Sequence, residues 1–176
     1  SALELNLAEI HEALAAALAD RPCLVWRERT WTWQEVTDRT RRLANVLREH
    51  GLGRHGRLDD LPGWASPHDH VGLYLQNGNA YLEAQLAASK AGAAAFNVNY
   101  RYVAEELAYQ IRDSAAAAIV YQDCYRDTLA DVLPRLDHRP LLLRVADGSG
   151  HDLLPGALDY EEALAAASPE RPDVAW

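Results

Sequence analysis

The chain has 176 residues, a formal net charge of −9 and a pI near 5.2, and 49% of its residues are hydrophobic. This length predicts one domain or a piece of a larger protein, because domains usually hold about 100 to 200 residues. The acidic balance argues against nucleic acid as a partner, since no basic face is available to neutralise phosphates. No apolar run approaches the ~20 residues of a membrane-spanning helix, so a soluble, cytoplasmic protein without a transmembrane segment is expected.

The first predicted element is a helix over residues 7 to about 19. Asn6 stands where an N-cap belongs, and Glu9 follows three residues later as in a capping box. The segment 20–22 ends the helix. Its apolar spacing predicts that four residues face the core: Ile10, Leu14, Ala17 and Leu18.

A hairpin and a second helix come next. Residues 23–26 and 30–32 read as two short strands around a polar tip. Thr32 and Glu35 form a second capping box, which opens a helix that runs to about His50 and ends at Gly51. The inner stripe of this helix is predicted to contain Val36, Thr40, Leu43, Val46 and Leu47, with the arginines of the helix pointing elsewhere.

An inserted loop over residues 54–67 precedes the next strand, at 68–75. A loop of this length in a compact unit is either functional or mobile. We favour a mobile loop, with Trp64 packed back against the body. His68 and His70 share one face of the strand, but no third ligand is evident, so no metal site is predicted.

The segment 80–113 reads as helix, glycine stop, short buried strand, polar loop and helix. Gly92 stands where a left-handed helix cap belongs, and residues 93–96 form the apolar strand. The polar loop 97–101 follows this strand directly. In an open α/β sheet, the carboxyl ends of the strands are where ligands bind.

The rest of the chain continues the alternation of strands and helices. Strands are predicted at 115–121 and 140–145, helices at 123–133 and 159–166, and a linker from residue 168. Cys23 and Cys124 are expected to be reduced, packed thiols. The fold class is therefore α/β, with a mostly parallel sheet and helices on both faces.

The segment around this loop also resembles a known family. Lys90-Ala91-Gly92-Ala93, then Asn97-Val98-Asn99-Tyr100-Arg101-Tyr102-Val103, then Glu106-Leu107 and Tyr109, look like the N-terminal part of the AMP-forming acyl-CoA synthetases. These enzymes belong to the adenylate-forming superfamily, and the loop is most similar to that of bacterial fatty-acyl and steroid-side-chain CoA ligases. The resemblance implies an N-terminal subdomain over 1–167, with 54–67 as an insertion, and a linker over 168–176.

The resemblance also implies a function and one binding residue. The parent enzyme would activate a carboxylic acid with ATP and Mg²⁺ and transfer the acyl group to CoA. Arg101 would contact the 3′-phosphate of CoA, a task suited to guanidinium; the alternative is a surface arginine paired with Glu105 or Glu106. Asn97 and Asn99 would shape the loop.

The catalytic residues of the family would follow Trp176, so the chain carries none and is expected to bind no cofactor tightly and to be inactive alone. In the family, the acyl pocket is built mostly from those later residues, so the acid is not specified here. Two other interpretations stay open: an adenylation domain of a peptide synthetase, and a free-standing α/β interaction module. The apolar surface exposed by truncation is consistent with a homodimer of the isolated chain.

Overall fold

The computed structural model describes residues 6–174. The first residues of the predicted subdomain, 1–5, and the end of the predicted linker, 175–176, lie outside the described residues. In chain order the elements are α1 (Leu7–Leu18), β1 (Pro22–Trp26), β2 (Arg29–Thr32), α2 (Trp33–Glu49), η1 (Leu58–Asp60), β3 (His70–Tyr74), α3 (Asn79–Ala91), β4 (Ala94–Asn97), α4 (Ala104–Asp113), β5 (Ala116–Gln122), η2 (Asp123–Tyr125), α5 (Arg126–Val132), η3 (Leu133–Arg135), β6 (Leu141–Val145), β7 (Leu158–Asp159) and α6 (Tyr160–Ala166).

The central sheet has five strands in the order β4-β3-β5-β6-β7, and every neighbouring pair is parallel. β1 and β2 form a separate antiparallel hairpin. The connection from β3 leads to one side of the sheet, through α3 to β4, and the connection from β5 leads to the other side, through α5 to β6. The predicted mostly parallel α/β sheet is confirmed.

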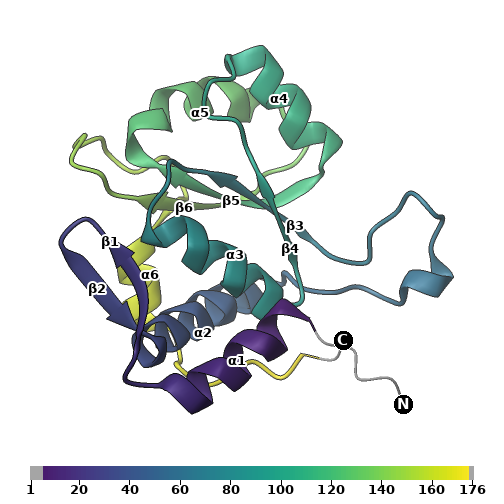
Figure 1. Ribbon diagram of the computed structural model, residues 1–176. Helices are drawn as coiled ribbons and strands as arrows, with labels where there is room; N and C mark the ends of the chain where they lie inside the picture. Colours follow the sequence, from purple (N-terminus) through teal and green to yellow (C-terminus); the bar gives the residue numbers. More distant parts are fainter. Residues whose placement is uncertain (1–5, 175–176) are drawn as a thin grey trace.

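Helices cover both faces of this sheet (Figure 1). α4 and α5 lie on one face, and α2, α3 and α6 lie on the other, with α1 outside α2 and α3. The side chains of the buried strands alternate between the two faces: Val120 packs with the α2–α3–α6 core, and its neighbours Ile119 and Tyr121 pack with the α4–α5 core. Two apolar cores therefore hold the sheet rigidly in place.

Local signals set the helix ends as predicted. At the start of α2, the Glu35 N–H donates to Thr32 Oγ1 over 3.2 Å, and the Thr32 N–H donates to the Glu35 carboxylate over 2.7 Å. Two of the N–H groups that a helix start leaves unpaired are satisfied in this way. At the end of α3, Gly92 adopts φ 79°, a conformation that favours glycine.

α1 turns a different face to the core from the one predicted. Asn6 caps it as expected, accepting from the Glu9 N–H over 2.9 Å. However, Ile10 and Leu14 are 43% and 41% exposed, whereas Glu12 is 7% exposed. Ala17 is also exposed and Leu18 only half-buried, so the predicted inner face was wrong. The residues that α1 does bury are Ala8, His11, Glu12 and Ala15.

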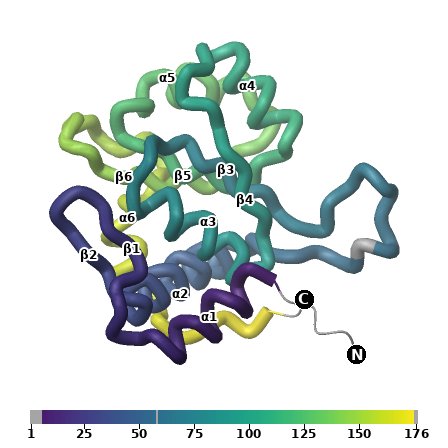
Figure 2. The backbone as a smooth tube through the Cα atoms, viewed as in Figure 1, coloured from purple at the N-terminus to yellow at the C-terminus, as the bar shows by residue number. Residues whose placement is uncertain are grey.

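The loop 54–67 extends away from the body of the molecule (Figure 2). Its neck is closed by a hydrogen bond of 2.6 Å from the His55 N–H to the Pro67 carbonyl, and the His55 ring lies 2.6 Å from the Asp69 carboxylate. Trp64 near the tip is 89% exposed. The expectation that Trp64 packs back on the body was wrong, because the closed neck directs the tip outward.

The described part of the predicted linker, residues 168–174, lies against the helices. The Asn45 side-chain amide donates to the carbonyls of Ser168 and Glu170, at 2.8 Å each, and Arg171 pairs with Glu9. Val174 reaches the C-terminal cap of α3, since its Cγ1 would lie 2.9 Å from a Cβ added to Gly92. Residues 168–174 therefore form a strap over α1, α2 and α3.

Candidate functional site

A cleft of about 920 Å³ opens at the carboxyl ends of β3, β5 and β6, under the β1–β2 hairpin. Ligands in open α/β sheets bind where neighbouring strands send their connections to opposite sides. Here those strands are β3 and β5. Gln76 follows β3 and Gln122 ends β5, and the Gln76 N–H donates to Gln122 Oε1 over 3.0 Å at this point. The cleft is the best candidate for a binding site in the described part of the chain.

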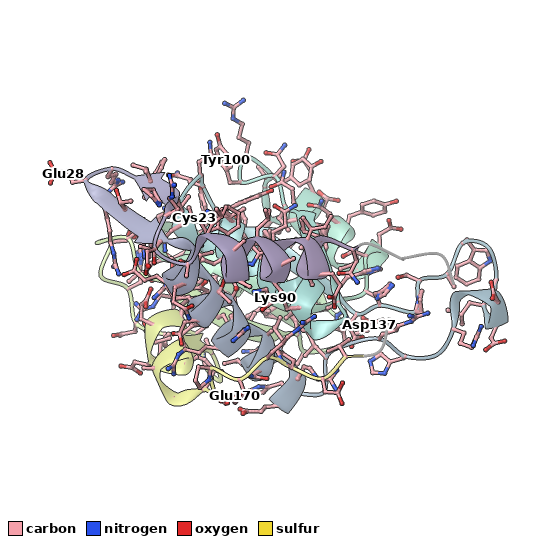
Figure 3. The ribbon with its side chains drawn as sticks, turned by 60° about the horizontal axis from the view of Figure 1, so that its bottom comes forward. Cys23, Glu28, Lys90, Tyr100, Asp137 and Glu170 are labelled. Carbon is pink, nitrogen blue, oxygen red and sulfur yellow. The ribbon has the colours of Figure 1, made fainter. Side chains whose placement is uncertain are left out.

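The aromatic lining of the cleft comes from both walls. Trp26 and Trp31 of the hairpin line one side, and Tyr100, which follows β4, lines the other. The Arg29 guanidinium lies 4.6 Å from the centre of the Trp31 ring, within the range of a cation–π contact. Figure 3 shows Glu28 at the hairpin tip and Tyr100 near the edge of the molecule, with Lys90 in the interior.

The polar loop 97–101 lies at this edge. Asn99 Oδ1 accepts from the Arg101 N–H over 3.0 Å, and the Asn99 carbonyl accepts from the Tyr102 N–H over 3.1 Å. Asn97 lies 3.4 Å from the Tyr81 hydroxyl, and its carbonyl accepts from Gln110. Both asparagines thus hold local contacts, and their loop-shaping role stays a prediction.

Arg101 is exposed, and its guanidinium lies 5.7 Å from the centre of the Tyr100 ring. Among residues 6–174, no ion pair joins Arg101 to Glu105 or Glu106. The Glu106 carboxylate instead accepts from the Val103 N–H over 3.2 Å, at the start of α4. The guanidinium at this loop is therefore available to an anion, and Arg101 itself lies beside the cleft and not in its lining.

The floor of the cleft is held by Asp147. Its carboxylate accepts from the Gln122 side chain and the Cys124 N–H at 3.1 Å each, and from the Ser149 N–H at 2.9 Å. Burial would raise the pKa of Asp147, but the hydrogen bonds from Ser149, Cys124 and Gln122 outweigh it and hold the pKa well below its usual range. Asp147 is thus an anion that fixes the loop after β6.

Cys124 is exposed and not packed as expected, because β5 ends at Gln122 and the thiol lies in the following turn. Burial of part of the thiol and the nearby Asp147 carboxylate raise the pKa of Cys124 to about 11. A thiol that stays protonated at neutral pH is a poor nucleophile. Cys23 is half-buried, and neither cysteine forms a disulfide.

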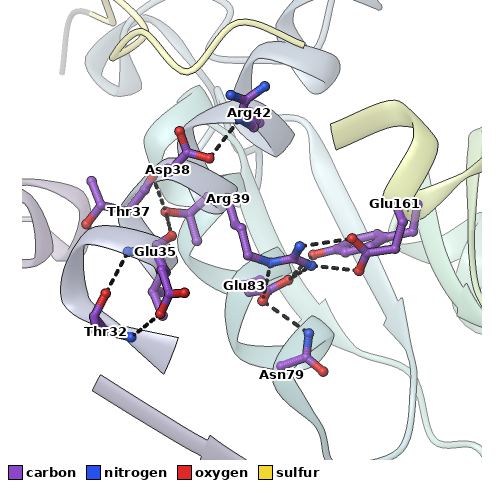
Figure 4. A network of polar contacts seen from close by, with 12 residues as sticks. Thr32, Glu35, Thr37, Asp38, Arg39, Arg42, Asn79, Glu83 and Glu161 are labelled. Carbon is purple, nitrogen blue, oxygen red and sulfur yellow. Dashed lines mark hydrogen bonds and ion pairs between the residues drawn. The ribbon is translucent and has the colours of Figure 1, made fainter. Parts of the chain in front are cut away.

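A partly buried ion network lies beside the cleft (Figure 4). The guanidinium of Arg39 donates to the fully buried carboxylate of Glu83 over 2.8 and 3.0 Å, and to Glu161 over 2.7 and 2.9 Å. The Tyr160 hydroxyl donates to Glu83 over 2.7 Å. Burial would lower the pKa of Arg39, but Glu161 and Glu83 raise it. Glu161 lines the cleft, so its charge there is balanced by Arg39.

Sequence reasoning missed Glu83, which lies on a buried face of α3, and the second buried pair, Glu12 and Lys90. One available signal was the position of Lys90, the single lysine of the chain, among the apolar residues of α3. The Nδ1–H groups of His68 and His70 donate to backbone carbonyls, that of Gly92 at 2.8 Å and that of Ser114 at 2.5 Å. No group of three metal-ligating side chains occurs within residues 6–174.

A sequence model of a family described as AMP-binding enzymes matches residues 11–175. A medium-chain acyl-CoA ligase, Mig, of Mycobacterium avium is 42% identical over 165 residues, which cover 94% of this chain and 30% of the ligase. A ligase of Mycobacterium tuberculosis is 35% identical over 171 residues, which cover 97% of this chain and 29% of that ligase. It is described as acting on medium- and long-chain fatty acids and on 3-oxocholest-4-en-26-oate.

The fold has solved relatives as well. The crystal structure of an anthranilate CoA ligase, AuaEII, in complex with anthranoyl-AMP matches with a TM-score of 0.80 at 17% identity, over 97% of this chain and 30% of that one. At this identity the match concerns the fold alone. The chain thus spans about 30% of the length of these relatives. In the described part of the chain, no helix is long and apolar enough to cross a membrane.

Proposed function

The chain belongs to the family of AMP-binding enzymes, and on this basis we propose that it is the N-terminal part of an ATP-dependent, AMP-forming acid–CoA ligase. The observation that carries the proposal is the identity of 42% and 35%, over nearly the whole chain, to two acyl-CoA ligases. These relatives are CoA ligases, which favours CoA over a carrier-protein thiol as the acyl acceptor.

The reaction of the parent enzyme would have two steps, adenylation of the acid and transfer of the acyl group to CoA. A carboxylate oxygen attacks the α-phosphorus of ATP, so that an acyl-adenylate forms and pyrophosphate leaves. The CoA thiol, on losing its proton, then attacks the acyl carbon and expels AMP. Both steps depend on positioning and on stabilising charge at phosphate. The names of the relatives support a medium- or long-chain fatty acid, or a steroid side-chain acid, as the substrate class.

Within this chain, Arg101 is the residue that fits a phosphate of CoA. Its guanidinium is exposed at the carboxyl edge of the sheet, and its recorded contact is an aromatic ring and not a carboxylate. Guanidinium matches phosphate geometry and stays charged at neutral pH. With Arg101 at its edge, the chain would form one wall of the CoA site of the parent.

The proposal is tested in the ligase of which this chain forms the N-terminal part. We expect the ligase to catalyse pyrophosphate exchange and thioester formation with medium- or long-chain acids. In the variant Arg101→Ala, we expect a higher KM for CoA and an unchanged rate of pyrophosphate exchange. The matched control is Arg112→Ala, which removes a basic side chain at the far end of α4. An unchanged CoA dependence in Arg101→Ala would contradict the role of Arg101, and an absence of acid-dependent exchange would contradict the ligase.

The 176-residue chain alone is expected to have no ligase activity and to bind ATP weakly or not at all. Isothermal calorimetry of the chain with ATP measures this directly. Binding in the micromolar range would show that the chain holds a nucleotide site of its own.

A further inference from the structure

Three tyrosines from three separate segments, the end of β3, η2 and the loop after β4, stack in series at the carboxyl edge of the sheet. The rings of Tyr74 and Tyr125 are 4.7 Å apart with an angle of 19°, and those of Tyr125 and Tyr100 are 6.0 Å apart with an angle of 20°. The Arg101 guanidinium continues the series, 5.7 Å from the Tyr100 ring. These separations are typical of stacked aromatic pairs and of cation–π contacts. The aromatic series thus runs from the core to the exposed guanidinium.

The inner end of the series is fixed. Tyr74 ends β3 and is 1% exposed, and it packs in the apolar core under α4 and α5. The hydroxyl of Tyr125 accepts from the Gln76 side chain over 2.8 Å, and the Gln76 backbone is bonded to Gln122. Tyr125 is therefore held from both sides by the segments that follow β3 and β5.

The outer end has fewer restraints. Tyr100 is 43% exposed, whereas Val98 in the same loop is fully buried. Asn99 orders the backbone at Arg101, but this bond does not set the direction of the Arg101 side chain. Within residues 6–174, the Arg101 guanidinium lies over the Tyr100 ring, and the Tyr100 ring stacks on Tyr125.

We propose that Tyr125 is a positioning residue that fixes Tyr100 by stacking and, through Tyr100, directs the Arg101 guanidinium toward an anionic group of the ligand. The inference rests on the proposed function, because the ligand group is taken to be a phosphate of CoA. Tyr125 touches no reacting atom and acts only by limiting the orientations of Arg101.

The first experiment uses the 176-residue chain. Tyr125→Leu removes the ring, Tyr125→Phe keeps the ring and loses only the hydroxyl, and Tyr109→Leu changes a 65% exposed tyrosine of α4 as a control. Nuclear relaxation at the Arg101 side chain is expected to show greater motion in Tyr125→Leu alone. Equal motion in Tyr125→Leu and in the unchanged chain, both shown to be folded by circular dichroism, would overturn the proposal.

The second experiment uses the ligase. Tyr125→Leu is expected to raise the KM for CoA about three- to tenfold, the range that the loss of one aromatic contact gives, with kcat and pyrophosphate exchange nearly unchanged. Tyr125→Phe, which keeps the ring, should have a KM for CoA close to that of the unchanged ligase. In the double variant with Arg101→Ala, Tyr125→Leu should raise the KM little beyond the value of Arg101→Ala alone. If Arg101→Ala raises the KM and Tyr125→Leu does not, positioning by Tyr125 is refuted while the role of Arg101 stands. If Arg101→Ala has no effect, the assigned role of Arg101 fails, and the inference fails with it.

Discussion

Lys90 and Glu12 form an ion pair of 2.7 Å in which both side chains are almost fully buried, 2% and 6% exposed. Lys90 Nζ also donates to Thr40 Oγ1 over 2.9 Å, and Arg41 donates to the same carboxylate. The pair joins α1 to α3 across α2. It explains why α1 turns Glu12 inward and leaves Ile10 and Leu14 at the surface, since two buried charges are stable only together.

Lys90→Met is expected to lower the free energy of unfolding by about 3–5 kcal/mol, because it leaves the Glu12 charge with fewer partners in the interior. Urea unfolding followed by circular dichroism measures the change. The control is Asp59→Asn, whose partner Arg57 lies 3.8 Å away with both side chains mostly exposed, and which should cost about 0–1 kcal/mol. Equal midpoints for Lys90→Met and the unchanged chain would exclude a structural role for the pair.

Stability should fall with acid in two stages. Burial, then Lys90, lower the pKa of His11 from 6.5 to about 4, while Arg41 and Lys90 overcome burial and lower that of Glu12 to about 2. Because both pKa values are lowered by folding, the unfolded state binds more protons than the folded state as the pH falls. The contributions of His11 and Glu12 to the free energy of unfolding are therefore fully present at neutral pH and are lost in acid. The His11 contribution, about 3 kcal/mol, is lost between pH 6.5 and 4, and that of Glu12 between pH 4.5 and 2.

His11→Phe tests the first stage. Phenylalanine keeps the ring contact with Trp33, whose centre lies 5.3 Å from that of His11, and cannot be protonated. The variant is expected to have nearly constant stability between pH 6.5 and 4.5 in urea unfolding. If it loses stability there as steeply as the unchanged chain, the titrating group is another one.

Gly92→Ala should destabilise the protein more than Gly148→Ala. Both glycines have positive φ, 79° and 90°, which costs an alanine about 1–2 kcal/mol. A Cβ at Gly92 would also meet Val174 at 2.9 Å, whereas one at Gly148 has open space around it. Thermal melting of both variants gives the comparison. Equal losses would mean that the strap moves aside at no cost.

Asn99→Ala is expected to loosen the loop 97–101 more than Asn97→Ala. The Asn99 side chain accepts from the Arg101 N–H at 3.0 Å, while the Asn97 side chain has only a long contact of 3.4 Å with Tyr81. Hydrogen exchange at the Arg101 amide should speed up about three- to tenfold in Asn99→Ala, as the loss of one hydrogen bond predicts. Faster hydrogen exchange at the Arg101 amide in Asn97→Ala than in Asn99→Ala would show that Asn97, and not Asn99, orders the loop.

Asn45→Ala should release the strap 168–174. Its side chain is the donor to two carbonyls of the strap, those of Ser168 and Glu170. Cleavage after Glu170 by a glutamate-specific protease is expected to become faster, without a change in the melting temperature of more than a few degrees. The control is Asn77→Ala, in the cleft and away from the strap. Equal cleavage rates in Asn45→Ala and Asn77→Ala would show that other contacts hold the strap.

Local sequence signals predicted the helices, the strands and the class of fold. Capping at Asn6 and Thr32, the glycine stop at Gly92 and the alternation of strands with helices depend on residues within a few positions of one another. Such local signals can be recognised without a structure. The loop 97–101 was placed correctly at the carboxyl end of a strand for the same reason, and it also carried the resemblance to the acyl-CoA synthetases.

Which buried faces meet depends on contacts between residues that are far apart along the chain. Arg39 and Glu83 are 44 residues apart, and Tyr100 and Tyr125 lie in segments that follow two different strands, β4 and β5. The amphipathic pattern of α1 pointed to the wrong face, because a pair of opposite charges and its hydrogen bonds outweighed two leucine-sized side chains. The free energy of such a pair depends on distance and burial in the folded state, and neither is written in the spacing of residues along the chain.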